Sequence, residues 1–275
     1  MQIRQAYIHI KSMLADGGIE NPGFEARQLT ARAGGFSYGD LLTADVSLDD
    51  RQMSLLIKTA EQRLSGEPLQ YLLGRWEFYG LPFEVGSGVL IPRPDTELLA
   101  EKAIEFCKDR SVNVLDLCSG SGCIAIAIKK HCVRAKVTAL EKSHSAIEYL
   151  RRNVALNNAD ITVIQGDLFD LPLGSEQFDL ITANPPYLTK DDMANMQTEL
   201  SAEPETALYG GVDGLDFYRF IIKEYKPYLA HGGAMMLEIG AGMYKNVSEI
   251  FTQENYKNIC HYKDLCGIIR VVTNN

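Results

Sequence analysis

Apolar residues recur at helical spacing through the first 73 residues of the chain. Ile10, Met13 and Leu14 share one face of a helix, and a similar pattern follows Met53. Glycine pairs and Asn21-Pro22-Gly23 separate these patterns, as expected for the turns between helices. The pattern predicts a small all-helical domain over residues 1–73, with no polar cluster suited to catalysis.

The pattern changes between residues 74 and 93. Aromatic and β-branched residues alternate there with glycines, which predicts a β-hairpin that joins two domains. Pro92 and Pro94 then impose an extended entry, and Asp95 or Thr96 can cap a helix that follows.

From residue 94 to the end, apolar runs alternate with helical patterns. The runs are 112–117, 137–140, 161–164, 178–183, 234–239 and 268–272. Near-continuous apolar strands with helices between them are typical of parallel sheets that are covered on both faces. The pattern predicts an α/β domain with a doubly wound, mostly parallel sheet.

The first of these strands runs into a glycine-bearing turn, which is a candidate cofactor site. The turn contains Cys118, Ser119, Gly120, Ser121 and Gly122. Asp116 lies near the carboxyl end of the strand. Glu141 ends the next strand about 20 residues later, where a carboxylate can accept hydrogen bonds from ribose hydroxyls. The glycines alone do not distinguish a site for this kind of cofactor from a dinucleotide site, or from a turn that binds no cofactor.

Other residues favour S-adenosylmethionine over a dinucleotide. This methyl donor has a ribose and an adenine but no pyrophosphate, and its ammonium group needs an acceptor such as Asp116. After the third strand, Asp167 could accept from the adenine amino group while Leu168 and Phe169 contact its face. The alternative for Asp167 is a turn cap.

The most informative segment is Asn184-Pro185-Pro186-Tyr187, which follows the apolar run 178–183. Two prolines end a strand and stiffen the backbone after it. The Asn184 side chain and the Pro185 carbonyl offer two acceptors for one NH2 group, at the sheet edge where ligands bind. The segment is typical of amino-directed methyltransferases, although a Pro-rich turn is the alternative.

Together with three further segments, these motifs resemble the bacterial release factor glutamine methyltransferases, the HemK/PrmC family. The further segments are 69–74, 77–81 and 89–97, the last reading Val-Leu-Ile-Pro-Arg-Pro-Asp-Thr-Glu. The resemblance implies a seven-stranded class I methyltransferase sheet in a catalytic domain over residues 94–275. It also implies a hairpin linker over 74–93 and a substrate-docking helical domain over 1–73.

The resemblance further implies the reaction. A methyl group passes from S-adenosylmethionine to the side-chain amide nitrogen of the glutamine in the Gly-Gly-Gln loop of class 1 peptide chain release factors, and S-adenosylhomocysteine is the product. Asn184 and Pro185 are then the catalytic residues. The implied donor contacts are Cys118, Ser119, Gly120, Ser121, Gly122, Glu141, Leu168 and Asn184, and the implied substrate contacts are Asn184, Pro185, Pro186 and Tyr187.

The sequence departs from the family pattern at two of these positions. The family often has glycine at Cys118 and a larger aromatic residue at Leu168, so Phe169 can share the adenine contact.

Composition and charge exclude or disfavour several other classes of function. The net charge of −9 disfavours a broad nucleic-acid surface, and scattered Cys and His residues disfavour a metal site. No apolar run reaches the roughly 18 residues of a membrane span, and no signal peptide opens the chain, so we expect a cytoplasmic protein with no membrane partner. The open alternatives are a methyltransferase for exocyclic amino groups of adenine or guanine in nucleic acid, and a non-enzymatic module that senses the cofactor.

Overall fold

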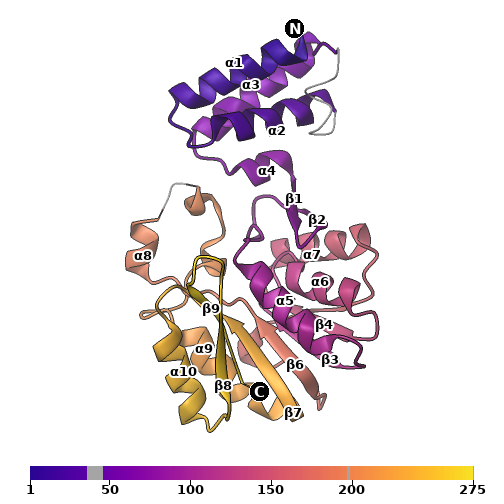
Figure 1. The fold of residues 1–275 in the computed structure, drawn as a ribbon, viewed down its shortest axis with the longest axis vertical. Coiled ribbons are helices and arrows are strands. Elements are labelled where there is room, and N and C mark those ends of the chain that lie inside the picture. The colour runs from indigo at the N-terminus through magenta and orange to yellow at the C-terminus, as the bar shows by residue number, and fades with distance from the viewer. Residues whose placement is uncertain (36–45, 197–198, 275) are drawn as a thin grey trace. The chain divides into compact units, whose positions relative to one another are not determined.

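The computed structural model describes residues 1–35, 46–196 and 199–274, so residues 36–45 of the predicted helical domain lie outside the described residues. The chain divides into two compact units (Figure 1). The first comprises Met1–Arg75 with Gln197–Ala202, and the second comprises Trp76–Met196 with Glu203–Asn275.

The first unit is helical. Its helices are α1 (Ile3–Asp16), α2 (Pro22–Gly34), α3 (Asp50–Leu64) and the short α4 (Leu69–Leu73). The Asp49 side chain caps α3 by accepting a hydrogen bond from the Gln52 backbone amide. The Gln52 side chain in turn accepts from the Asp49 backbone amide, which makes a capping box. The helix therefore begins at Asp50, directly after its cap.

A buried ion pair holds the interior of this unit. Arg63 on α3 donates from Nε to Glu25 on α2 at 2.6 Å and also pairs with Glu199. The Arg63 side chain is 5 % exposed, so removal of either charge would leave its partner in a poorly solvated position.

The predicted hairpin consists of β1 (Arg75–Phe78) and β2 (Leu81–Glu84). Tyr79 and Gly80 connect the two strands, and both have positive φ angles of 51° and 71°. Positive φ at both central residues matches the twist of a two-residue hairpin loop. The buried amide of Asn153 accepts from the Glu84 amide and donates to the Glu84 carbonyl and to the Ser121 carbonyl, so it joins the hairpin to the glycine-bearing turn.

The second unit contains the predicted seven-stranded sheet, with strand order β5-β4-β3-β6-β7-β9-β8. The strands are β3 (Asn113–Leu117), β4 (Lys136–Glu141), β5 (Thr162–Gln165), β6 (Phe178–Ala183), β7 (Leu229–Glu238), β8 (Ile259–Lys263) and β9 (Ile269–Asn274). The pairs from β5 to β7 are parallel, and β9 runs antiparallel to both of its neighbours.

Helices cover both faces of this sheet, as expected for a doubly wound fold. One apolar core contains residues of α5 (Thr96–Cys107), α6 (Cys123–His131) and α7 (His144–Leu156), and the other contains residues of α9 (Asp216–Glu224) and α10 (Tyr244–Gln253). Successive β3 residues serve opposite cores: Val114 faces the first and Leu115 the second. The predicted fold class is confirmed.

Strand register determines where the chemistry-bearing residues lie. Leu117 of β3 is level with Leu140 of β4 and with Ala183 of β6. Because the strands are parallel, the residues that follow them emerge at one edge. Cys118, Glu141 and Asn184 are therefore gathered there.

Asp95 occupies the position before α5 but makes no side-chain capping bond, and its carboxylate pairs instead with Arg270 at 2.8 Å.

No helix within the described ranges is both long enough and apolar enough to cross a membrane.

Candidate active site

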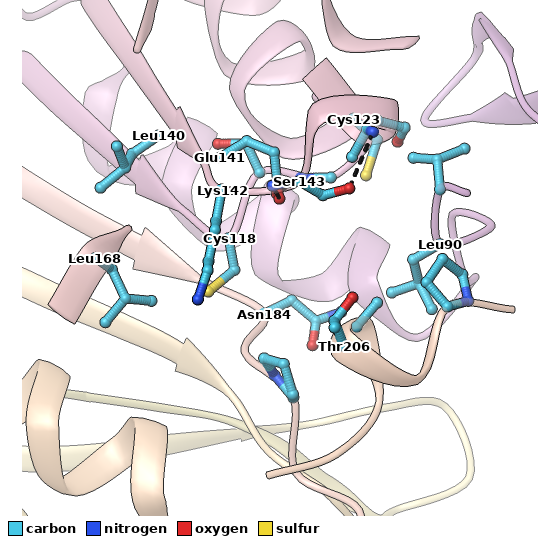
Figure 2. A pocket seen from close by; sticks show the side chains of 18 of the residues that line it. Leu90, Cys118, Cys123, Leu140, Glu141, Lys142, Ser143, Leu168, Asn184 and Thr206 are labelled. Atoms are coloured by element: carbon cyan, nitrogen blue, oxygen red, sulfur yellow. Dashed lines mark hydrogen bonds between the residues drawn. The ribbon is translucent and has the colours of Figure 1, made fainter. Parts of the chain in front are cut away.

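A cavity of about 620 Å³ opens at the carboxyl edge of the parallel strands in the second unit. In Figure 2, Leu140, Glu141 and Leu168 lie on one side of it, and Leu90 and Thr206 lie on the other. The cavity brings together most of the residues that the sequence singled out. Those that line it are Cys118, Ser119, Gly120, Ser121, Glu141, Asp167, Leu168, Phe169, Asn184 and Pro186.

The turn after β3 is tightly folded against its surroundings. The Gly122 amide donates to the Ser119 carbonyl at 2.7 Å, and the Ser119 amide donates to the Leu140 carbonyl at 3.1 Å. Gly122 has a φ of 82°, and a Cβ atom there would overlap Leu150. Gly122 does not line the cavity, so glycine is required at this position by backbone geometry and packing.

Cys118 begins this turn with a φ of 54°, in the left-handed region that costs an L-residue roughly 1–2 kcal/mol. Burial raises the pKa of the Cys118 thiol well above its ordinary value, and the neighbouring carboxylates of Glu141 and Asp116 act in the same direction. A raised pKa favours the protonated thiol at neutral pH, which is a weaker nucleophile than the thiolate.

The Glu141 carboxylate fixes two segments at once. One oxygen accepts from the Gly120 amide at 2.8 Å, and the other accepts from the Ser143 amide at 2.7 Å, just before α7. Burial raises the pKa of Glu141 in spite of these hydrogen bonds. Each oxygen retains a lone pair, so this carboxylate can hold a ligand's hydroxyl groups as well as the turn.

Asp116 lies beneath the turn and does not line the cavity. It is fully buried, and its Oδ1 accepts from the Thr182 hydroxyl at 2.8 Å. Its Oδ2 has no hydrogen-bond partner among the described residues, and burial raises its pKa to about 7. This position supports the turn from below, and a direct contact between Asp116 and a ligand stays a prediction.

The wall beyond β5 combines one acid with apolar residues. Asp167 caps the short helix η2 (Leu168–Asp170) by accepting from the Phe169 amide, and it pairs with Lys142 at 2.6 Å. Burial raises the pKa of Asp167, but the bonds from Lys142 and Phe169 outweigh that effect and lower it. The turn-cap role of Asp167 is thus present, and its contact with adenine stays a prediction.

Leu168 and Phe169 contribute differently to this wall. Leu168 is buried, whereas Phe169 is 41 % exposed and packs at a tilt against Phe217 and Phe220, with ring centroids 5.2 and 4.6 Å away. Leu168, Phe169 and Phe217 all line the cavity. An apolar surface for a flat ring is therefore available from both predicted residues.

Asn184 follows β6 directly and faces the cavity. Its Nδ2 donates to the hydroxyl of Thr96, the buried first residue of α5, at 3.1 Å. This bond directs the NH2 end of the amide towards the protein and leaves Oδ1 as an acceptor for a ligand.

Pro185 and Tyr187 are held in place but do not line the cavity. A Cβ at Gly210 would lie 2.5 Å from the Tyr187 Cα, and one at Gly240 would lie 3.0 Å from its ring. The glycines let neighbouring backbone pack directly on Tyr187. This packing fixes the chain after Pro186, while the substrate contacts of Pro185 and Tyr187 stay predictions.

Two cavity walls were not assigned a role from the sequence. They are the segment from Gly88 to Arg93 and the segment from Pro204 to Tyr209. Glu203 joins them: its carboxylate accepts from the Ile91 amide at 3.0 Å and pairs with Arg93, and its side chain is 1 % exposed. For the segment from Gly88 to Arg93, the unusual Pro-Arg-Pro sequence was the feature from which a role could have been predicted.

Comparisons with known proteins define the class of the protein. The model of the "Methyltransferase small domain" family matches residues 94–211, and that of the "PrmC N-terminal domain" matches residues 5–74. The structure of a methyltransferase from Pyrococcus furiosus superposes with a TM-score of 0.57 and 18 % identity, covering 82 % of this chain and 98 % of that one. A 16S rRNA N2 G1207 methyltransferase from Thermus thermophilus, in complex with AdoMet and guanosine, gives a TM-score of 0.54 at 16 % identity, covering 73 % and 49 %. These likenesses show the methyltransferase fold.

Curated relatives define the family. The release factor glutamine methyltransferase of Thermodesulfovibrio yellowstonii is 41 % identical over 84 % of this chain and 85 % of the relative. That of Geobacter sulfurreducens is 39 % identical over 98 % and 95 %. The chain therefore belongs to the release factor glutamine methyltransferase family, which confirms the predicted enzyme class.

The positive φ of Cys118 predicts an order of stability for two substitutions. Both Cys118→Gly and Cys118→Ala remove the thiol, but only glycine adopts the left-handed conformation without strain. We expect Cys118→Gly to have a free energy of unfolding higher by about 1 kcal/mol than Cys118→Ala. Urea unfolding of the two variants measures this difference, and an alanine variant at least as stable would show that the backbone at this position is unstrained.

Proposed function

We propose that the protein transfers a methyl group from S-adenosylmethionine to the side-chain amide nitrogen of the glutamine in the Gly-Gly-Gln loop of class 1 peptide chain release factors. The names of its relatives support release factors as substrates. Because this substrate acts in translation, we also place the protein in the cytoplasm. The net charge of −9 and those relatives disfavour nucleic acid as the substrate.

The observation that carries the proposal is the orientation of Asn184 at the cavity wall. Its NH2 group is bonded to Thr96, so its carbonyl oxygen is the end available to the cavity. An NH2 group entering the cavity would find an acceptor there, and we assign the second acceptor to the backbone carbonyl of Pro185. Two acceptors would hold both amide protons of a glutamine side chain.

The cavity fits the proposed donor. A volume of about 620 Å³ lies within the usual range for small-molecule sites, roughly 300–1,000 Å³. The Glu141 carboxylate lies beside the turn, and we assign it to the ribose hydroxyls; we assign the apolar surface of Leu168 and Phe169 to the adenine. The buried carboxylates of Asp116 and Glu141 favour a cationic ligand at this edge.

When bound, S-adenosylmethionine supplies an electrophilic methyl group on a sulfonium and is left as S-adenosylhomocysteine after transfer. The protein's task is orientation, because an amide nitrogen is a poor nucleophile whose lone pair is delocalised into the carbonyl. Acceptors at Asn184 and Pro185 would pin the two amide protons and turn the nitrogen towards the methyl carbon. Holding such a geometry can contribute several kcal/mol.

The same acceptors would act again as the bond forms. The nitrogen gains positive charge when it is methylated, and oxygen atoms fixed beside it stabilise that charge. The surplus amide proton is then released to water. We assign no side chain as a strong general base.

We further propose that residues 1–73 serve substrate docking. Within the described residues 1–35 and 46–73, this segment has its own buried ion pair and a capping box at α3, and none of these residues lines the cavity of the second unit. A separate docking surface would let the enzyme select an intact release factor instead of any exposed glutamine.

The proposed function is tested by mass spectrometry of a bacterial class 1 release factor after incubation with the protein and S-adenosylmethionine. We expect the glutamine of the Gly-Gly-Gln loop to gain one methyl group. A release factor with Gln→Ala at that position, together with tRNA and rRNA transcripts, provides the controls. Methylation of a nucleic acid with none on the release factor would replace this proposal with the amino-group alternative.

Glu141 should be required for donor binding. Glu141→Ala removes the acceptor for ribose hydroxyls and frees the Gly120 amide, so we expect S-adenosylmethionine to bind more weakly by about 1–3 kcal/mol. Calorimetry on the free protein measures this change. Glu148→Ala removes an exposed acid from α7 and should leave the affinity unchanged, whereas equal affinities for both variants would take Glu141 out of the site.

A further inference from the structure

Glu238 is a buried acid that lies beside Asn184. It ends β7, the strand paired with β6, and Leu237 is level with Ala183 in the register of these two strands. Glu238 and Asn184 are therefore the next residues on neighbouring parallel strands. Glu238 is only 4 % exposed, and nothing in the reaction outlined above uses it.

The Glu238 carboxylate is linked to Asn184 in two ways. Asn184 Nδ2 donates to Thr96 Oγ1 at 3.1 Å, and both side chains lie near enough to the carboxylate to lower its pKa. Because the Thr96 hydroxyl accepts from Asn184, its own proton is left to donate to Glu238. The buried Oε2 of Glu238 has no partner in the part of the chain that the structure describes.

We propose that Glu238 is a positioning residue that works with Thr96 to fix the side-chain amide of Asn184 with its oxygen towards the substrate. This inference rests on the proposed function and deepens it. An ionised carboxylate can only accept hydrogen bonds, so it holds the NH2 end of Asn184 and excludes the flipped amide. Its negative charge also favours the positive charge that develops on the substrate nitrogen.

Several titratable and charged groups set the ionisation of Glu238. Burial raises its pKa to about 7, the bonds from Thr96 and Asn184 lower it, Asp95 raises it and Arg270 lowers it. The hydroxyl of Tyr218 on α9 donates to the Glu238 backbone carbonyl. The charge of this carboxylate also raises the pKa of Tyr187 and of Cys123.

The sign of the pH effect follows from these groups. Above pH 7 the acid is ionised and holds Asn184 as described. As the pH falls through the pKa, the acid gains a proton and becomes a donor that can bond the Asn184 oxygen, in competition with the substrate. Turnover should therefore fall on the acid side.

The first test observes Asn184 directly, in the full chain without donor or substrate. The side-chain NH2 resonances of Asn184 are assigned in ¹⁵N-labelled protein by their loss in Asn184→Asp. We expect them to titrate with a midpoint near pH 7 in the wild type and to stay flat in Glu238→Gln. In Thr96→Val the midpoint should move upward, because a bond that lowers the Glu238 pKa is lost.

The second test follows turnover of a class 1 release factor with S-adenosylmethionine as a function of pH. Glu238→Gln should lower kcat by about 10- to 100-fold, the range for losing a group that orients a reacting ligand, with much smaller changes in KM. It should also abolish the acid limb of the kcat profile. Because burial also raises the pKa of Asp116 to about 7, an acid limb that persists in Glu238→Gln would assign the limb to Asp116.

Tyr218→Phe is the matched control. It removes a buried hydrogen bond to the backbone of Glu238 but leaves the carboxylate intact. We expect lower stability with an unchanged Asn184 titration and an unchanged kcat profile. If Glu238→Gln does not fold, Thr96→Val carries the test through the upward shift of the midpoint.

The outcomes separate this inference from the proposed function. The positioning role is overturned if the chemical shift of the Asn184 NH2 group does not change with pH in the wild type, or if Glu238→Gln retains full turnover. If the resonance titrates as described but the wild type leaves the release factor unmethylated, the proposed substrate is wrong and the Glu238–Asn184 contact stands.

Discussion

The parallel pairing of β3 with β4 and β6 is the constraint on which the site depends. Leu117, Leu140 and Ala183 lie level with one another, so the chain leaves all three strands at the same edge. The turn that begins at Cys118, the Glu141 carboxylate and the Asn184 amide meet there only because this register holds. A shift of one residue in any strand would exchange the faces on which its side chains lie and would separate these groups.

Three acids at this edge share one electrostatic property. Burial raises the pKa of Asp116, Glu141 and Glu238, so their ionisation opposes folding. An acid whose pKa is higher in the folded than in the unfolded state lowers stability as the pH rises between the two values. These three acids therefore contribute a loss of stability between the ordinary carboxyl pKa, about 4, and about pH 7. A cationic ligand bound at the same edge would offset that cost, which ties donor binding to the stability of the fold.

The sequence predicted those features that depend on local pattern. Residues 112–117 and 178–183 are apolar on both faces, which predicts strands of a parallel sheet that is covered on both sides. The predicted enzyme class is confirmed by family membership. The strand β8 was absent from the predicted apolar runs because its apolar residues alternate with polar ones at the sheet edge. Contacts between distant residues could not be predicted: Asn184 and Thr96 are 88 residues apart, and Glu203 and Ile91 are 112 apart. The packing of Tyr187 against Gly210 and Gly240 likewise depends on the folded chain.

We propose that Asn184 orients the reacting nitrogen, and single-turnover methylation by Asn184→Ala measures that role. A class 1 release factor is the substrate, and donor binding is measured on the same protein by calorimetry. We expect the methylation rate to fall at least about 100-fold, the scale for losing one preorganised partner of the transition state. The dissociation constant of S-adenosylmethionine should change far less. A near-normal rate in Asn184→Ala would contradict the two-acceptor mechanism.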